Sequence, residues 1–345
     1  MKVLTLIAAL LMIAQVADCQ TINQEKLSAL SEAAKLTHTE GLLIYHEEEV
    51  ILEKYYGIGH PDTLIETMSC TKSIVGLAAA CLLDDGYLDS LSTPVYKFYP
   101  EWNQGNKKNI TVEHLLTMTS GIQNHPNASK EIYPSPDFVQ LALTAELDEL
   151  PGEKFRYNNK SLNLMAGIFA KATGKRMDEY IAERLFKPLG ITSYNWTLDE
   201  SGNPHIMSGC QIKPKDFLKF GILLLNEGEF KEKQIISKEN IKKVVSPIEQ
   251  YKGYGLLWWV DYESMQYKVD SEIIENLQEK KTDKEFVDKM NLLKGSYTDF
   301  DSFEKKVIGI FGENPWEYIQ SNISSFDEFR KKELTGKVTN YRADG

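Results

Sequence analysis

One short segment constrains this chain more than any other: a serine, Ser69, stands three residues before a lysine, Lys72, at the start of a long apolar run. The run extends from Ile74 to Leu83 and is apolar on nearly every side of a helix, whereas a surface helix carries a single apolar stripe. We therefore predict a helix that runs through the middle of a domain and ends at the sequence Asp84-Asp85-Gly86.

The spacing of Ser69 and Lys72 suits the activation of a nucleophile. Residues three apart lie on the same face of a helix, so the lysine amine can reach the serine hydroxyl. The N-terminus of the helix would place positive potential and free N–H groups beneath Ser69. A weak nucleophile becomes a strong one when a base lies within hydrogen-bond reach.

A Ser-x-x-Lys spacing arises by chance about once in a few hundred residues, so the spacing alone leaves a structural and a catalytic interpretation of Ser69 about equally supported. The chain contains the same spacing a second time, at Ser302 and Lys305. That second copy lies in a charged, amphipathic stretch with no buried helix after it, and we interpret it as solvated surface.

Residues 1–19 are typical of a secretory signal peptide. Lys2 precedes an apolar run from Val3 to Val16, which is too short for a stop-transfer helix and is followed by small residues. We therefore expect an exported protein, periplasmic or extracellular. Cys19 could carry a lipid anchor, but Asp18 is unfavourable directly before a lipobox cysteine, so we favour simple cleavage.

Charge and cysteine content narrow the classes of partner and cofactor. The 345-residue chain has a formal net charge of -11, which argues against nucleic acid or an anionic membrane surface as a partner. Beyond the signal peptide the cysteines are Cys70, Cys81 and Cys210, and the first two are eleven residues apart on one predicted helix, too far for a disulfide. No Cys/His spacing indicates a metal site, so we expect neither metal nor cofactor. The oligomeric state is left open.

The predicted secondary structure changes type along the chain. Residues 23–36 have the spacing of an amphipathic helix, and residues 41–56 read as a β-hairpin with an acidic turn. From about residue 87 to 245 the pattern predicts helical segments broken by prolines. A β-like run at Tyr254 to Val260 is expected to resume the sheet that begins at residue 41.

The stretch between about residues 263 and 336 is rich in lysine and glutamate. It contains amphipathic pieces at 286–293 and 326–334. We predict that it is a helical insertion. The chain beyond the signal peptide is long enough for one large domain or for a core domain with an inserted one.

A second group of chemically capable residues lies on a predicted loop, where Tyr157 and Asn159 can point into one cleft. Tyr157 could pass a proton to or from the nucleophile, with its pKa lowered by a neighbouring ammonium. Asn159 could bond both that ammonium and a substrate carbonyl. In the alternative interpretation Tyr157 packs and Asn159 caps the following helix.

Together these segments resemble the serine β-lactamase and penicillin-binding protein superfamily, closest to its class C β-lactamase-like branch of esterases and D-alanyl-D-alanine peptidases. The similarity runs from about Gly41 to Val260 and keeps the family's order. It includes SCTKSIVGLAAACLLDDGYLDSLSTPV, ITVEHLLTMTSGI, PGEKFRYNNKSLNLMAGIFAKATGK, RLFKPLGI and KPKDFLKFGILLLNEGEF.

The resemblance implies an α+β fold in which an antiparallel sheet is flanked by helices and joined by an all-helical region, with residues 20–345 forming one such domain. Ser69 matches the family's nucleophile and Lys72 its partner base. Tyr157 matches the second proton-transfer residue, and Asn159 the amide that orients the lysine and the substrate.

The family's third motif, Lys or His followed by a small residue and Gly, is altered in this chain. Leu334-Thr335-Gly336 begins with an apolar residue, and the better match is Ala343-Asp344-Gly345, because some esterase-like and amide-hydrolysing members carry alanine there. Ala343 and Gly345 are therefore expected at the substrate site. Since further strands and a helix follow this motif in the family, we expect the C-terminal strands to be missing from this chain.

The resemblance implies a secreted serine hydrolase that works through an acyl-enzyme on a small-molecule or peptide substrate: an ester, an amide, a β-lactam or a D-alanyl peptide. In the family the Lys or His of the third motif helps to hold a substrate carboxylate, which Ala343 cannot do. An ester or amide is therefore favoured over a β-lactam. The alternative is a non-catalytic or truncated binding or sensing protein on the same fold.

Overall fold

The computed structural model describes residues 22–125, 127–323 and 326–344, and the chain divides into two compact units, Met1–Thr63 and Leu64–Gly345. The signal peptide expected at 1–19, with Cys19, lies outside the described residues, as does Gly345. In the described part of the chain, no helix combines the length and the apolar character needed to cross a membrane.

The first unit is a helix followed by a hairpin, as the sequence predicts: α2 (Gln24–Lys35), β1 (Gly41–His46) and β2 (Glu49–Tyr55). The Asn23 side chain accepts a hydrogen bond from the Lys26 amide and so caps α2. The acidic turn between the strands places Glu47 and Glu48 at positive φ, 46° and 68°, which matches the twist of a tight hairpin.

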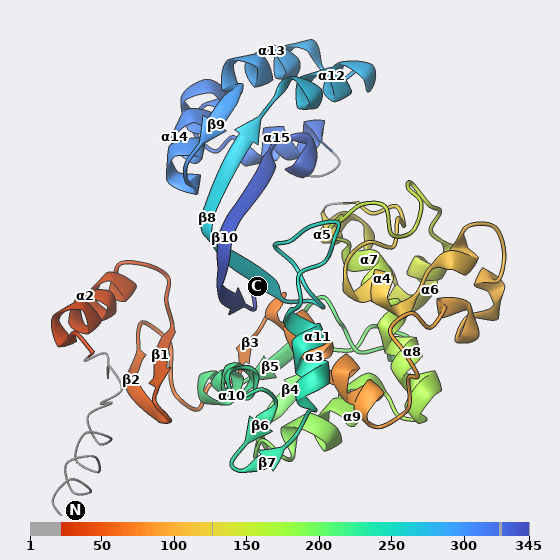
Figure 1. The fold of residues 1–345 in the computed structure, drawn as a ribbon, viewed down its shortest axis with the longest axis vertical. Coiled ribbons are helices and arrows are strands. Elements are labelled where there is room, and N and C mark those ends of the chain that lie inside the picture. Colours follow the sequence, from red (N-terminus) through yellow and green to blue (C-terminus); the bar gives the residue numbers. More distant parts are fainter. Residues whose placement is uncertain (1–21, 126, 324–325, 345) are drawn as a thin grey trace, which may run out of the picture. The chain divides into compact units, whose positions relative to one another are not determined.

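Helix α3 (Cys70–Asp84) runs through the core of the second unit, and twelve of its fifteen residues are buried. This confirms the prediction made from its continuous apolar character. Helix α11 (Lys238–Val245) packs beside it (Figure 1). The other helices of this region are α4 (Val112–Leu116), α5 (Ala128–Glu131), α6 (Phe138–Thr144), α7 (Asn159–Leu162), α8 (Leu164–Thr173), α9 (Met177–Ile181) and α10 (Pro214–Leu225).

In the described residues, the strands before and within the helical region are short. They form a three-stranded antiparallel sheet in the order β3-β5-β4 and a small hairpin, β6-β7. Their bounds are β3 (Ile65–Glu66), β4 (Tyr194–Trp196), β5 (Cys210–Ile212), β6 (Glu229–Phe230) and β7 (Lys233–Gln234). Strand β3 leads directly into the turn before α3.

The segment at Tyr254 to Val260 differs from the predicted continuous strand, because regular pairing starts only at Trp259. The residues before it form a buried loop against α3. A Cβ on Gly76 would lie 2.4 Å from the Leu256 carbonyl oxygen, so glycine is what permits this approach. The Ser73 hydroxyl donates to the Leu257 carbonyl over 2.9 Å, which satisfies part of the loop's buried backbone.

The region after Trp259 has its own apolar core and more sheet than the sequence predicts. Strand β8 (Trp259–Val269) pairs with β9 (Gly295–Tyr297) and with β10 (Lys331–Arg342), in the order β10-β8-β9. The sheet is accompanied by the helices α12 (Ser271–Glu279), α13 (Lys284–Leu293), α14 (Phe300–Phe311) and α15 (Trp316–Asn322) (Figure 1). We call residues 263–336 the insertion.

One expectation about this region is wrong. Residues 326–334 form a short 3₁₀ turn and the start of β10, because pairing with β8 supplies backbone partners that outweigh the helical pattern of the segment. The expectation that the strand at Trp259 resumes the sheet of residue 41 stays a prediction. In the described residues β1 pairs with β2, whereas β8 pairs with β9 and β10.

Candidate active site

Ser69 stands at the entrance of α3, at a sharp turn of the backbone. Met68, just before it, has a φ of 45°, a conformation that is uncommon outside glycine. The turn is fixed to strand β5, because both the amide and the hydroxyl of Thr67 donate to the Cys210 carbonyl over 2.9 Å. These contacts hold the Ser69 side chain at the start of the helix, where the sequence predicts it.

Lys72 is buried directly behind the serine, with only 2% of its surface exposed. Its Nζ lies 2.8 Å from Ser69 Oγ and 2.8 Å from the Met207 carbonyl oxygen. Burial, opposed only by the charge of Cys70, lowers the pKa of Lys72 from 10.5 to about 7. A large share of this amine is therefore neutral near neutral pH and can accept a proton.

The loop that carries Tyr157 is anchored to the segment after α4. The Arg156 amide donates to the Met118 carbonyl over 2.8 Å, and Asn158 Nδ2 donates to the Ile122 carbonyl over 2.6 Å. Tyr157 lies near enough to Ser69 for that serine to lower its pKa, and Lys72 Nζ lies 5.1 Å from the centre of its ring. The structure thus brings together the three residues that the sequence analysis assigns to proton transfer.

The pKa of Tyr157 changes in the opposite direction from the prediction. Burial raises it to about 12, against the lowering effect of Ser69 and with the raising effect of Asp344. The prediction assumed a full positive charge on the neighbouring lysine. Because burial also lowers the pKa of Lys72, that charge is reduced and Tyr157 remains protonated at neutral pH.

Asn159 lies at the first position of α7 and lines the same pocket as Ser69. Its Oδ1 is buried without a hydrogen-bond partner among the described residues. The expected hydrogen bond from the Lys72 ammonium to this amide is therefore not formed. The Met207 carbonyl is the second acceptor for Lys72 instead. The cap of α7 is Asn158, whose side chain accepts from the Ser161 amide over 2.9 Å.

The residues proposed for the third motif follow directly after β10. Ala343 packs against the main apolar core and lines a small cavity together with Ser73 and Ile74 of α3. Asp344 lines the pocket of Ser69 and forms an ion pair with Arg342. The segment therefore faces the helix of the nucleophile, with an acidic group at the position next to Ala343.

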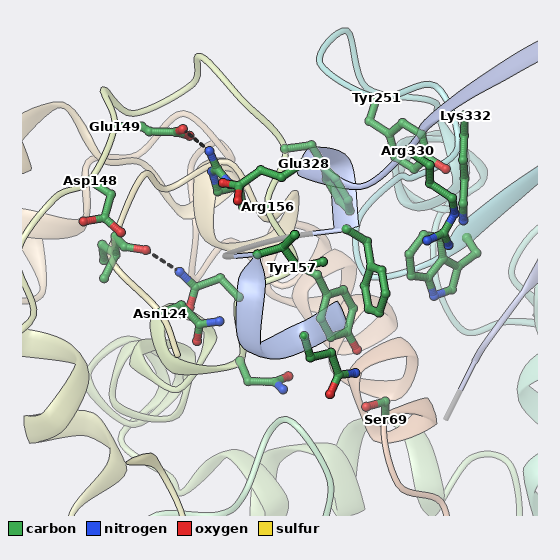
Figure 2. A pocket seen from close by; sticks show the side chains of 18 of the residues that line it. Ser69, Asn124, Asp148, Glu149, Arg156, Tyr157, Tyr251, Glu328, Arg330 and Lys332 are labelled. Atoms are coloured by element: carbon green, nitrogen blue, oxygen red, sulfur yellow. Dashed lines mark hydrogen bonds and ion pairs between the residues drawn. The ribbon is translucent and has the colours of Figure 1, made fainter. Parts of the chain in front are cut away.

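Ser69, Tyr157 and Asn159 open onto a pocket of about 810 Å³. Figure 2 shows Ser69 and Tyr157 facing this space, with Asp148 and Glu149 on one side and Arg330 and Lys332 on the other. By contrast, Ser302 is exposed and its hydroxyl donates to the carbonyl of Asp299, the capping residue of α14. The interpretation of the second Ser-x-x-Lys copy as surface is thus confirmed.

Two contributors to the site escaped the sequence analysis. The backbone carbonyl of Met207 accepts a hydrogen bond from the Lys72 amine. Every residue type has such a carbonyl, so the sequence could not predict this contact. Trp259 stacks on Tyr157, with ring centroids 6.0 Å apart and an angle of 14° between the rings. In the sequence Trp259 belongs to a β-like run, and no local pattern predicts its contact with the loop of Tyr157, about one hundred residues earlier.

An α+β fold with a central helix that starts at a serine and buries a lysine one turn later defines the β-lactamase/transpeptidase-like class. The chain belongs to the Beta-lactamase family, whose profile matches residues 33–268, and members of this family are serine hydrolases.

Several known proteins are similar to this chain. Protein flp of Staphylococcus aureus strain MRSA252 is 28% identical over 187 residues, which cover 50% of this chain and 37% of flp. The chain thus spans well under half the length of this relative.

Two solved structures share the fold. A D-stereospecific amidohydrolase from Streptomyces sp. has a TM-score of 0.53 at 20% identity and covers 68% of this chain and 83% of its own. The octameric penicillin-binding protein homologue from Pyrococcus abyssi has a TM-score of 0.55 at 23% identity, with coverages of 69% and 65%.

Proposed function

We propose that this protein is an exported serine hydrolase that cleaves an ester or amide through an acyl-enzyme. The observation that carries the proposal is the 2.8 Å contact between Lys72 Nζ and Ser69 Oγ, made by a lysine whose pKa burial lowers to about 7. A neutral amine at hydrogen-bond distance from a hydroxyl is the arrangement that general-base activation of a nucleophile requires.

In the proposed reaction Ser69 Oγ attacks the substrate carbonyl carbon while Lys72 takes the hydroxyl proton. The backbone N–H of Ser69 is one donor to the oxygen that becomes negative in the tetrahedral intermediate. The intermediate collapses, the bond to the leaving group breaks, and the leaving group receives the proton. Water then attacks the acyl carbon and gives one proton to Lys72. The bond between the acyl carbon and Ser69 Oγ breaks, Oγ takes that proton back from Lys72, and the acid leaves.

Tyr157 has a different task from Lys72 in this scheme. With a pKa raised to about 12 it keeps its proton at neutral pH, so it serves as a hydrogen-bond donor and as a relay to the leaving group, and Lys72 is the initial base. Asn159, whose Oδ1 is buried and has no hydrogen-bond partner in the part of the chain that the structure describes, is proposed to bind a substrate N–H or to turn its amide toward a carbonyl.

The substrate class follows from what surrounds Ser69. Ala343 supplies no cation, and its neighbour Asp344 is an acid that already pairs with Arg342, so neither residue offers a partner to a carboxylate close to the scissile bond. This supports an ester or amide over a β-lactam or a D-alanyl peptide. The structural similarity to a D-stereospecific amidohydrolase agrees with an amide substrate.

Covalent labelling with a fluorophosphonate probe tests the proposal. We expect one adduct per chain on the peptide that contains Ser69, its loss in Ser69→Ala, and unchanged labelling in Ser302→Ala, the matched serine of the second motif copy. A folded protein that no fluorophosphonate or penicillin probe labels would instead support the alternative, a binding or sensing protein on this fold. N-terminal sequencing of the protein after expression in a secreting host tests the export.

A further inference from the structure

The carbonyl that accepts from the buried lysine lies on a short loop, residues 205–209, which we call the Met207 loop. The loop is closed at its base by Thr197, whose carbonyl accepts from the His205 amide over 2.9 Å and whose amide donates to the Gly209 carbonyl over 2.9 Å. Met207 lies midway between these two anchors. The position of the acceptor therefore depends on how the ends of the loop are held.

The Gly209 end of the loop is tied to an acidic side chain. Gly209 has a φ of 101°, in the left-handed region, and a Cβ there would lie 2.8 Å from His205 Cβ, so the turn requires glycine. Its amide donates to Glu66 Oε1 over 2.6 Å. Hydrogen bonds to a carboxylate are about twice as strong as those between neutral groups, so Glu66 holds this turn firmly.

The same carboxylate oxygen holds a second turn, the one before the nucleophile. The Met68 amide donates to Glu66 Oε1 over 3.2 Å, at the residue whose φ of 45° makes the turn sharp. Ser69 follows directly, and its own N–H is the proposed oxyanion donor. One oxygen atom therefore accepts hydrogen bonds from the turn that orients Ser69 and from the loop that carries the acceptor of Lys72.

Strand pairing keeps the Glu66 carboxylate in this place. Glu66 is the last residue of β3 and lies opposite Gln211 of β5, whose Nε2 is 3.5 Å from the second carboxylate oxygen. Thr71 of α3 adds a further link, because its hydroxyl accepts from the Cys210 amide over 3.3 Å. The carboxylate is thus held between the strand before the nucleophile and the strand after the Met207 loop.

Glu66 has no direct access to a substrate. It lies outside the lining of the pocket that the described residues form around Ser69. Any effect of Glu66 on the reaction therefore passes through the two backbone amides that it accepts from, those of Met68 and Gly209.

A second carboxylate offers a matched control at the opposite end of α3. Asp84 accepts from the Ser237 amide and from Asn240 Nδ2, each over 2.7 Å, and so ties α3 to the start of α11. It is the last residue of this fifteen-residue helix, which Ser69 precedes, and such a helix is about 22 Å long. Both acids join two segments through a pair of hydrogen bonds, but Glu66 does so beside the nucleophile and Asp84 far from it.

We propose that Glu66 is a positioning residue: it holds the turn of Ser69 and the Met207 loop in register, so that the serine hydroxyl and the loop carbonyl both meet Lys72. This inference rests on the proposed hydrolase function and adds to it a residue that touches neither substrate nor reacting atoms. The two turns require an acceptor oxygen at the reach of a glutamate side chain. Glutamine has that oxygen and that reach without the charge, whereas aspartate has the charge and is one methylene shorter.

Steady-state hydrolysis of p-nitrophenyl butyrate compares these substitutions. We expect Glu66→Ala to lower kcat/KM by about ten- to a hundredfold, because small displacements of catalytic groups have effects of this size. Glu66→Gln should stay within about threefold of the wild type, and Glu66→Asp should lose about tenfold. Asp84→Ala should leave kcat/KM unchanged. Urea unfolding defines conditions in which each variant is fully folded, so a loss of stability alone does not change kcat/KM.

Three results would overturn the inference. They are a fully folded Glu66→Ala with the kcat/KM of the wild type, equal losses in Glu66→Ala and Asp84→Ala, or a Glu66→Gln variant as impaired as Glu66→Asp. The last result would assign the effect to the charge of Glu66. If Glu66→Ala does not fold, the comparison of Glu66→Gln with Glu66→Asp decides alone.

Hydrogen exchange keeps the inference separate from the proposed function. If the wild type neither hydrolyses the ester nor takes up a fluorophosphonate label, the hydrolase proposal fails, and exchange measured by NMR decides whether Glu66 holds both turns. The amides of Met68 and Gly209 should both exchange at least about tenfold faster in Glu66→Asp than in Glu66→Gln. Faster exchange at one of the two amides alone, or at neither, rejects the shared anchor.

Discussion

The indole of Trp259 lies parallel to the phenol of Tyr157, with ring centroids 6.0 Å apart. Trp259 is the first residue of β8, the strand that leads into the insertion. The residue proposed for proton relay therefore packs against the start of the strand that leads into the insertion, and residues of the insertion line the same pocket.

The proton-transfer pair should behave as a unit. Lys72→Ala and Tyr157→Phe are each expected to lower kcat by about a hundred- to ten-thousandfold, the usual contribution of a positioned acid or base. Since both act on the same Ser69 proton, the double variant should lose far less than the product of the two factors. Steady-state kinetics on a p-nitrophenyl ester measure this, and strictly multiplicative losses would show that the two residues work independently.

The pH dependence of kcat/KM should report on Lys72. Its pKa of about 7 means that the amine is protonated and unable to act as base at lower pH, so activity should rise with pH and level off above about 7. Tyr157, with a pKa of about 12, should not limit activity in this range. A profile that stays flat between about pH 5.5 and 8.5 would contradict the assignment of Lys72 as base.

The sequence predicted those features that depend on local pattern. The apolar run after Ser73, the helical spacing of residues 23–36 and the acidic hairpin turn each contain their own signal, and the structure confirms all three. The neutral state of the lysine and the protonated state of Tyr157 depend on burial by distant segments. The start of β10 depends on a partner strand more than sixty residues earlier.

Burial of Lys72 should cost stability, and the cost should fall as pH rises. The folded pKa of about 7 lies below the ordinary value of 10.5, so between these values the unfolded state binds more protons and the free energy of unfolding of the wild type increases with pH. Lys72→Met lacks this dependence. We expect the variant to be more stable than the wild type at pH 7, with the difference shrinking by about 3 kcal/mol by pH 10.

Urea unfolding of both proteins at the two pH values measures that difference. Titratable groups that both proteins share contribute equally to the two free energies of unfolding, so their contributions cancel in the difference. If the difference in the free energy of unfolding stays constant or widens with pH, Lys72 keeps its charge when the protein is folded.

The contact between α3 and the buried loop should be sensitive to one methyl group. In Gly76→Ala the new Cβ would lie 2.4 Å from the Leu256 carbonyl, so we expect a loss of about 1–3 kcal/mol in the free energy of unfolding. The control is Gly221→Ala in α10, where no heavy atom lies within 4 Å of the new Cβ. There alanine should be neutral or stabilise by up to about 1 kcal/mol. A Gly76→Ala variant as stable as Gly221→Ala would contradict the described packing.

The pairing of β8 with β10 also bears on how far this protein's substrate range can change. Tyr262 lies opposite Val338, and antiparallel partners are about 5 Å apart, so the chain leaves the catalytic part and returns to it at nearly the same point. Topologically the insertion is an enlarged hairpin loop, and the entropy of closing a loop rises only slowly with its length. A different segment could therefore replace it while Trp259 and Arg342 keep their pairing, so the part of the pocket lining that the insertion supplies can change while the contact between Ser69 and Lys72 stays the same.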